Sequence, residues 1–140
     1  MAPNKFTRKE RFGRILQRIP LEARNELRDA LTRAAEVVNE TQRSYVPVED
    51  GTLRQSIRHD PVNESEGKIA VAIRAGGRTT TRPVRDGASV TYDYAMAQEF
   101  GTKEMRANPF FFPGYRVNRK RVRSRVTRAV KKAARRAADV

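Results

Sequence analysis

The sequence predicts a single α+β domain in which a long N-terminal helix and a basic C-terminal helix pack on a small, mostly antiparallel β-sheet. Apolar residues recur at steps of three and four in residues 20–46 and again in residues 114–138, as on one face of an amphipathic helix. After the turn that follows the first of these segments, the period changes to two, most clearly in Lys68–Ala75, which is typical of strands. With 140 residues, 38% of them hydrophobic, the chain can form one domain with a modest core.

The first 46 residues are predicted to contain two helices. Residues 1–19 form an arm with a short amphipathic helix over Phe6–Ile19, whose apolar residues are Phe6, Phe12, Ile15, Leu16 and Ile19. Pro20 suits the first turn of the long helix 20–46, where its missing N–H is no loss. This helix must end near Val46, because the residue before Pro47 is disfavoured in the α conformation. The core-facing positions of the long helix are Leu27, Leu31, Ala34, Val38, Thr41 and Tyr45.

Residues 47–106 are predicted to form the sheet region. Pro47–Gly51 is a turn sequence in which Gly51 is free to take a positive φ. Ile57 opens a strand, and Asn63–Gly67 forms a polar turn after it. Lys68–Ala75 is the clearest strand, since its isoleucines and valine point one way and its first alanines the other.

After this strand, the chain is predicted to form a loop, a short returning strand and a short helix. Residues 76–88 have no apolar period and are predicted to form an exposed loop, followed by a short strand with Val90 and Tyr92. Tyr94–Phe100 is predicted to be a two-turn helix that ends at Gly101. Residues 107–138 then comprise an extended aromatic segment, Ala107–Pro113, and the terminal helix.

The net charge is concentrated on this terminal helix, predicted from Gly114 to Ala138. Residues 1–47 hold ten bases and six acids, residues 48–113 hold nine of each, and residues 114–140 hold eleven bases and one acid. The difference of +10 in the last segment supplies most of the total of +14. At about 100° per residue, one side of the helix is an apolar seam of small residues: Val122, Val126, Ala129, Val130, Ala133 and Ala137.

The opposite side of the terminal helix is a cationic face, which consists of Lys120, Arg121, Arg128, Lys131, Lys132 and Arg135. A helix that is merely solvated normally mixes both signs of charge, because i,i+4 ion pairs then stabilise it. We therefore interpret the cationic face as a surface for nucleic acid or for an acidic protein, rather than as a solvated face.

No constellation of catalytic or metal-binding residues is visible in the sequence. The chain has no cysteine, which excludes disulfides, zinc–thiolate sites and cysteine nucleophiles, and His59 is its one histidine. Asp60, Glu64 and Glu66 lie in or near a predicted turn, where acids are ordinary. Glu99 is expected to be a partly buried carboxylate in a salt bridge or a backbone cap. Phosphate-binding glycine loops, nucleophile elbows and zinc-protease motifs are also missing, so we predict no enzyme activity, no metal and no cofactor.

Phe110, Phe111 and Phe112 are three consecutive aromatic residues. In an extended segment they would point to alternate sides, so at least one of them cannot join the same core as its neighbour. The local segment is not basic, which argues against a platform for stacking nucleic-acid bases. We interpret the three residues as a core anchor combined with a subunit contact.

Three strings in a fixed order carry a resemblance to a known family. They are PVEDGTLRQSI at Pro47–Ile57, YAMAQEFGT at Tyr94–Thr102 and ANPFFFP at Ala107–Pro113. A long helix, these strings, intervening strands and a terminal helix resemble the head–tail joining proteins of long-tailed bacteriophages and related gene transfer agents. Such proteins are also called neck, tail-completion or morphogenesis proteins. The resemblance covers nearly the whole chain from Pro20 onward.

The motif residues are expected to be structural scaffold. They are Pro47, Gly51, Leu53, Ser56, Tyr94, Glu99, Phe100, Gly101, Pro109, Phe110 and Pro113. Tyr94 and Phe100 would anchor the short helix on the sheet, and Pro109 and Pro113 would bracket an aromatic plug. Gly114 departs from the pattern, because a helix-favouring alanine is expected at that position.

The resemblance implies a structural virion protein of the phage neck, assembled in the host cytoplasm and without a membrane partner. Its subunits would form a closed sixfold or twelvefold ring, and each subunit would need two different, complementary faces. The ring would contact neighbouring neck, portal-adaptor or tail-tube proteins, and genomic double-stranded DNA would pass through its lumen.

Two surfaces are assigned roles within this ring. The cationic face would either line the lumen or dock on acidic patches of an adjacent ring. Arg78, Arg82 and Arg85 would lie on a mobile loop that becomes ordered against a neighbouring ring or DNA. The alternative function is that of a sequence-independent, double-stranded nucleic-acid-binding protein, which uses the basic C-terminal helix as a phosphate clamp.

Overall fold

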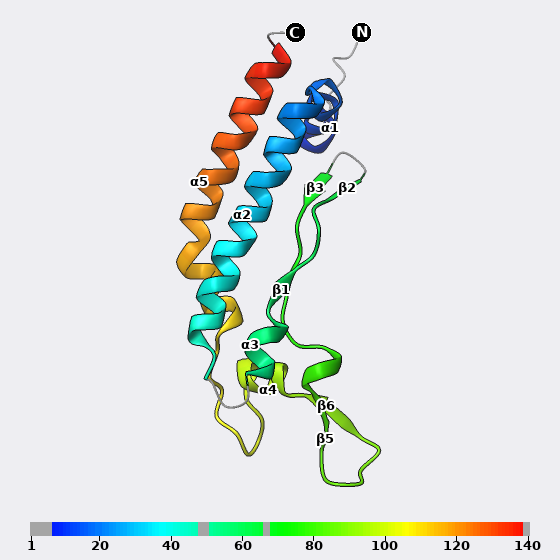
Figure 1. The fold of residues 1–140 in the computed structure, drawn as a ribbon, viewed down its shortest axis with the longest axis vertical. Helices are drawn as coiled ribbons and strands as arrows, with labels where there is room; N and C mark the ends of the chain where they lie inside the picture. Colours follow the sequence, from blue (N-terminus) through cyan, green and yellow to red (C-terminus); the bar gives the residue numbers. More distant parts are fainter. Residues whose placement is uncertain (1–6, 48–50, 66–67, 139–140) are drawn as a thin grey trace. The chain divides into compact units, whose positions relative to one another are not determined.

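Figure 1 shows the fold in a computed structural model, which describes residues 7–47, 51–65 and 68–138. The elements in chain order are α1 (Arg8–Arg18), α2 (Leu21–Tyr45), α3 (Thr52–Ser56), β1 (Arg58–His59), β2 (Asn63–Ser65), β3 (Lys68–Ala70), β4 (Ile73–Arg74), η1 (Arg78–Thr80), β5 (Thr81–Pro83), β6 (Thr91–Asp93), α4 (Tyr94–Phe100) and α5 (Phe111–Ala138). The α+β fold class is therefore confirmed.

The chain divides into two compact units, and each is described by itself. Unit 1 comprises Met1–Ala34, Pro61–Ala72 and Lys120–Val140, and unit 2 comprises Ala35–Asp60 and Ile73–Arg119. The prediction of a start at Phe6 for the first helix falls outside the described residues. The same holds for positions 48–50 and 66–67 of the two predicted turns.

The first two helices lie where the sequence predicts them. Thr7 caps α1 through a capping box, in which Thr7 N–H donates to Glu10 Oε2 at 2.7 Å and Glu10 N–H donates to Thr7 Oγ1 at 3.3 Å. The hydrogen bond from the Thr7 N–H holds the pKa of Glu10 below its ordinary value. Pro20 immediately precedes α2 instead of lying in its first turn, and its carbonyl accepts from Arg24 N–H at 3.0 Å. The long helix ends at Tyr45, as the proline at position 47 predicts.

The core of unit 1 joins the first turns of α2 to the last turns of α5, which run side by side in Figure 1. Its buried residues are Leu16, Ile19, Ala23, Leu27 and Ala133, with Ile69, Ala129, Val130 and Ala137 packed against them. Four residues of the predicted seam therefore contact this core. Alanine side chains permit a close approach of the two helix backbones.

The β2–β3 hairpin of unit 1 corrects the prediction of a polar turn from residue 63. Asn63, Glu64 and Ser65 form a strand that pairs antiparallel with β3. Glu64 is held against α2, because its Oε2 accepts from Arg28 Nη2 at 2.7 Å and its Oε1 lies 3.7 Å from Arg24 Nε. A strand of polar residues carries no apolar period, so its pairing could not be read from the sequence.

The predicted strand Lys68–Ala75 is split into β3 and β4. Ile69, Val71 and Ile73 are half-buried while Ala70 and Ala72 are exposed, so the predicted alternation is confirmed. The two halves pair with different partners, β3 with β2 and β4 with β1. The described strands form three separate two-stranded antiparallel pairs, where the sequence suggested one sheet.

The core of unit 2 gathers short elements around the aromatic segment. Val46, Leu53, Ile57, Ala95 and Phe110 are buried, and Ala75, Tyr94 and Phe111 pack against them. Leu53 lies on α3, a short helix at positions for which the sequence predicts no element. Gly51 precedes α3 with a φ of 79°, as expected for this turn.

Part of the predicted loop 76–88 is ordered. Thr80 is fully buried in η1, and β5 pairs antiparallel with β6, so that Thr81 lies opposite Asp93. The Asp93 carboxylate accepts from Thr80 Oγ1 at 2.6 Å, from Ala95 N–H at 2.9 Å and from Gly77 N–H at 3.0 Å. One aspartate therefore fixes the start of the loop and caps α4.

The aromatic segment is not extended throughout, because α5 begins at Phe111, three residues before the predicted start. Pro113 therefore occupies the first turn of a helix, where proline is tolerated. The other end of α5 agrees with the prediction, and α4 spans Tyr94–Phe100 as predicted, with Gly101 at its C-cap in a positive-φ conformation.

Buried amides connect α2 to the first turns of α5 within unit 2. Gln42 is fully buried, accepts from Asn39 Nδ2 at 3.1 Å and donates from Nε2 to the carbonyl of Phe111 at 3.0 Å. Asn118 Nδ2 donates to Thr41 Oγ1 at 2.8 Å and to the Gly114 carbonyl at 2.9 Å. These bonds satisfy polar groups that would otherwise be costly to bury.

Candidate functional site

The cationic face forms one continuous side of α5. All six of its residues are exposed, whereas the residues of the apolar seam are half-buried or buried. In the described part of the chain, Lys132 is the one residue of this face with an ion pair, at 3.6 Å from Glu26 Oε2. Partial desolvation would raise the pKa of Glu26, but the hydrogen bond and charge of Arg136 and the charge of Lys132 outweigh it and lower that pKa. Most of the positive charge of this face is thus uncompensated by the described residues of the subunit.

A second feature is the junction between α4 and the start of α5 in unit 2. The Glu99 carboxylate, 6% exposed, accepts three backbone hydrogen bonds, from Phe110 at 2.8 Å, Phe111 at 2.9 Å and Phe112 at 3.1 Å. These N–H groups belong to the first turn of α5 and have no partner within the helix, and the helix dipole favours a negative charge beside them. The expected backbone cap is therefore observed, and the Glu99 carboxylate has a structural role.

An open cleft of about 460 Å³ lies beside this junction. Three large apolar side chains of its lining are exposed: Met96 by 62%, Phe100 by 64% and Phe112 by 45%. The Phe100 and Phe112 rings lie 6.2 Å apart. The expectation that Phe100 anchors α4 is wrong, since its ring faces solvent, whereas Tyr94 does pack on the core.

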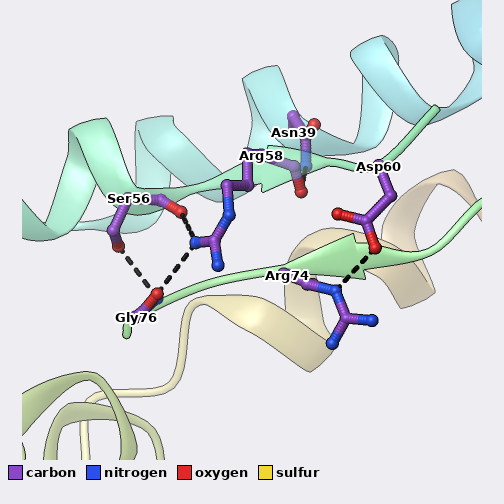
Figure 2. A network of polar contacts seen from close by, with 6 residues as sticks. All are labelled: Asn39, Ser56, Arg58, Asp60, Arg74 and Gly76. Carbon is purple, nitrogen blue, oxygen red and sulfur yellow. Dashed lines mark hydrogen bonds and ion pairs between the residues drawn. The ribbon is translucent and has the colours of Figure 1, made fainter. Parts of the chain in front are cut away.

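Arg58 and Arg74 are among the residues that line this cleft. Figure 2 shows the polar contacts that these two arginines make. Arg58 Nη1 donates to the carbonyls of Ser56 and Gly76, both at 2.8 Å, and Ser56 Oγ accepts from Gly76 N–H at 2.9 Å. Arg74 Nε donates to Asp60 at 2.7 Å. The Arg58 side chain forms no ion pair within the described residues, so its charge remains available to a partner.

The three arginines of segment 76–88 lie in different settings. Arg78 is part of η1, and Arg82 lies over the Tyr94 ring, with its Cζ 5.5 Å from the ring centroid. Arg85 is exposed in the turn that joins β5 to β6, where its carbonyl accepts from Ala88 N–H at 3.0 Å. A role of this segment against a neighbouring ring remains a prediction.

The acidic residues near His59 lie in separate contacts. His59 Nδ1 is 2.9 Å from Asn39 Oδ1, Asp60 is paired with Arg74, and Glu64 contacts α2 in unit 1. Glu66 lies outside the described residues. Among the side chains that the structure describes, no group of three or more histidines and acids could hold a metal ion.

The motif residues of unit 2 largely surround the α4–α5 junction. Leu53, Ser56, Glu99 and Phe110 are buried, and Gly101 is held so tightly that a Cβ would lie 2.8 Å from Ala107 N. Pro47 and Pro109 are exposed. Sequence reasoning missed Met96, although its spacing of four from Phe100 on α4 is a usable signal for a shared apolar face.

The chain has been compared with known proteins. Residues 10–101 match the family described as "Bacteriophage HK97-gp10, putative tail-component". The chain belongs to this HK97 gp10-like family. The match covers about two thirds of the chain and includes the first string recognised in the sequence and all of the second except Thr102. No curated protein and no solved structure matches the chain.

Membership of the HK97 gp10-like family identifies a structural protein of the phage tail or neck region. Such a protein is a virion component and contacts other virion proteins. The segment ANPFFFP and the whole of α5 lie beyond the matched residues. No described helix has the length and hydropathy required to cross a membrane.

Proposed function

We propose that this HK97 gp10-like protein forms a closed ring at the head–tail junction and that genomic double-stranded DNA passes through its lumen. One observation carries the proposal. The cationic face presents six exposed bases on one side of α5, and within the described residues a single one of them is paired inside the subunit. Uncompensated charge of this density favours contact with a polyanion or an acidic surface.

A DNA channel must attract phosphates without gripping them. Lysines and arginines on a helix surface attract DNA through long-range charge that is independent of base sequence. Such attraction is screened over roughly 10 Å at 0.1 M salt, so it weakens as salt rises. Diffuse charge on the cationic face fits passage better than it fits a tight clamp.

A ring also requires lateral contacts. In cyclic symmetry, one face of each subunit meets a different face of the next subunit. The exposed Met96, Phe100 and Phe112 provide an apolar surface suited to such a contact. Sixfold and twelvefold rings both satisfy this requirement.

The test is charge reversal of the cationic face with Arg128→Glu, Lys131→Glu and Arg135→Glu in one chain. The matched control reverses three exposed bases elsewhere, with Arg54→Glu, Lys103→Glu and Arg106→Glu, so that the net charge changes equally. Ring assembly is read by electron microscopy, and affinity for a short DNA duplex is measured between 50 and 200 mM salt.

If the cationic face lines the lumen, both variants should still form rings. The slope of log K against log salt should fall by roughly one for each phosphate contact removed, and it should fall in the first variant alone. Assembled particles of that variant should retain or eject DNA poorly. Failed assembly with unchanged DNA affinity would instead show a docking face, and tight DNA binding by an isolated monomer would favour the phosphate-clamp alternative.

A further inference from the structure

Helix α4 has an unusual distribution of burial. Its buried residues are Ala95, Ala97 and Glu99, two small side chains and a carboxylate. Its exposed residues include Met96 and Phe100, whose large apolar side chains globular proteins usually bury. When large apolar residues of a helix are exposed to solvent, they form a surface suited to a protein partner.

The cleft beside α4 combines this apolar surface with a positive charge. Met96, Phe100 and Phe112 line it, as does Arg58, which has no ion pair in the described part of the chain. Its other arginine, Arg74, is neutralised by Asp60 at 2.7 Å. The lining also contains two carboxylates, Asp93 and Glu99, and each of them already accepts three hydrogen bonds within the subunit. A complementary partner would bring apolar side chains together with one carboxylate.

The β5–β6 hairpin of the same unit has this composition. Val84 N–H donates to the Val90 carbonyl at 2.9 Å, which extends the pairing of Arg82 with Tyr92 and Pro83 with Thr91. Because side chains alternate along a strand, Val84 and Val90 lie on the same face of the ribbon as Arg82 and Tyr92. Val84 is 53% exposed, Val90 65% and Tyr92 42%.

The turn at the end of this hairpin supplies the negative charge. Asp86 is exposed and forms no ion pair among the described residues. The tip therefore carries two exposed valines and a carboxylate, while the cleft carries three exposed apolar side chains and a guanidinium. Neither charged group has an ion pair with another described residue. A two-stranded ribbon is marginally stable alone in water, so a hairpin with an uncovered apolar face gains from a partner.

We propose that the β5–β6 hairpin of one subunit docks in the α4 cleft of the next subunit. Val84 and Val90 would pack against Met96, Phe100 and Phe112, with Asp86 directed towards Arg58. This inference rests on the proposed ring, because hairpin and cleft are different surfaces of one subunit. Each subunit therefore offers both halves of the contact, which is the arrangement that cyclic closure requires.

The chain contains no cysteine, so an engineered disulfide reports the contact without interference. A variant with both Val90→Cys and Met96→Cys is assembled and then oxidised. The expected product is a ladder of covalent oligomers on a denaturing gel that ends at the number of subunits in the ring. Each single-cysteine variant should give no product larger than a dimer.

A matched control pairs Val90→Cys with Val117→Cys. Val117 is 66% exposed on α5 and does not line the cleft, so this pair should give no ladder. A charge change tests the same contact independently. Asp86→Arg should raise the concentration at which rings form by about tenfold, which corresponds to roughly 1.4 kcal/mol. Glu40→Arg, at an exposed position of α2, should leave it unchanged.

The outcomes separate this inference from the proposed function. Rings that form normally but yield no ladder, or a ladder from the Val117 control as well, would overturn the docking of the hairpin while the ring stands. If electron microscopy shows no ring at any concentration, the proposed function itself fails. A ladder from the Val90–Met96 pair alone, together with weakened assembly of Asp86→Arg, establishes the contact.

Discussion

Gly114 lies directly against Gln42, at the point where α5 meets α2 in unit 2. A Cβ atom on Gly114 would be 2.6 Å from Gln42 Cγ, 3.0 Å from its Cα and 3.1 Å from its N. Two of these atoms belong to the backbone and cannot rotate away. Gly114 is therefore explained by the packing of two helices, although glycine costs roughly 1 kcal/mol relative to alanine within a helix.

The first prediction is that Gly114→Ala destabilises the protein by about 1–3 kcal/mol, because overpacking outweighs the gain in helix propensity. The measurement is urea unfolding followed by circular dichroism. Thr127→Ala, at an exposed position of the same helix, serves as the control and should change stability by less than about 0.5 kcal/mol. A Gly114→Ala protein as stable as the wild type would show that the helices separate easily here.

The second prediction concerns the carboxylate that caps α5. Glu99→Ala removes the acceptor of three N–H groups, of which that of Phe110 is buried, and should cost about 3 kcal/mol or more. Glu99→Gln keeps one acceptor oxygen and should lie between this variant and the wild type. Glu104→Ala removes an exposed carboxylate nearby and should be close to neutral. If all three variants were equally stable, the Glu99 cap would not contribute to the stability of the fold.

The third prediction concerns the apolar seam in unit 1. Ala133 is 3% exposed and packs with Leu16 and Leu27. Ala133→Asp places an unpaired carboxylate in this core and should cost several kcal/mol. Val126→Asp, at a half-buried position of the same seam, should cost less. If thermal melts of the Ala133→Asp variant matched the wild type, the seam would not belong to the core.

The helices of this fold are predictable from the sequence because each has a strong local signal. The long helix is closed by Pro47, α4 by Gly101, and both long helices carry a continuous apolar period. The strands are less predictable, since they are two or three residues long. A period of two cannot be established over so few positions, and their pairing depends on contacts such as that of Glu64 with Arg28.

The two candidate surfaces also differ in how far the sequence predicts them. The cationic face follows from helix period and charge, both of which are local. The apolar cleft does not, because the burial of Phe110 and the exposure of Phe112 depend on where Glu99 holds the start of α5. The core-anchor interpretation of the three phenylalanines is confirmed for Phe110, and the subunit contact stays a prediction.

The last prediction concerns proteolysis of segment 76–88, where trypsin could cleave after Arg78 and Arg85, since Pro83 blocks cleavage after Arg82. Arg78 lies in a short helix tied by Thr80 to Asp93, and Arg82 contacts the Tyr94 ring and the Thr79 carbonyl. Cleavage requires local unfolding, so fixed backbone protects a site. Arg85 is the exception, because it is exposed in the hairpin turn.

Between these two sites, brief digestion of the isolated protein should therefore cut first after Arg85, as mass spectrometry of the fragments can establish. Arg85→Gln should remove this cut and leave the others unchanged. Because the proposed docking covers the hairpin tip, assembly into rings should slow cleavage after Arg85 several-fold, while cleavage after Arg18, exposed at the end of α1, stays the same. First cleavage after Arg78 would mean that the contacts of Thr80 and Asp93 open more readily than the turn. If the rate of cleavage after Arg85 were the same in rings as in the isolated protein, the hairpin would not be covered by a neighbouring subunit.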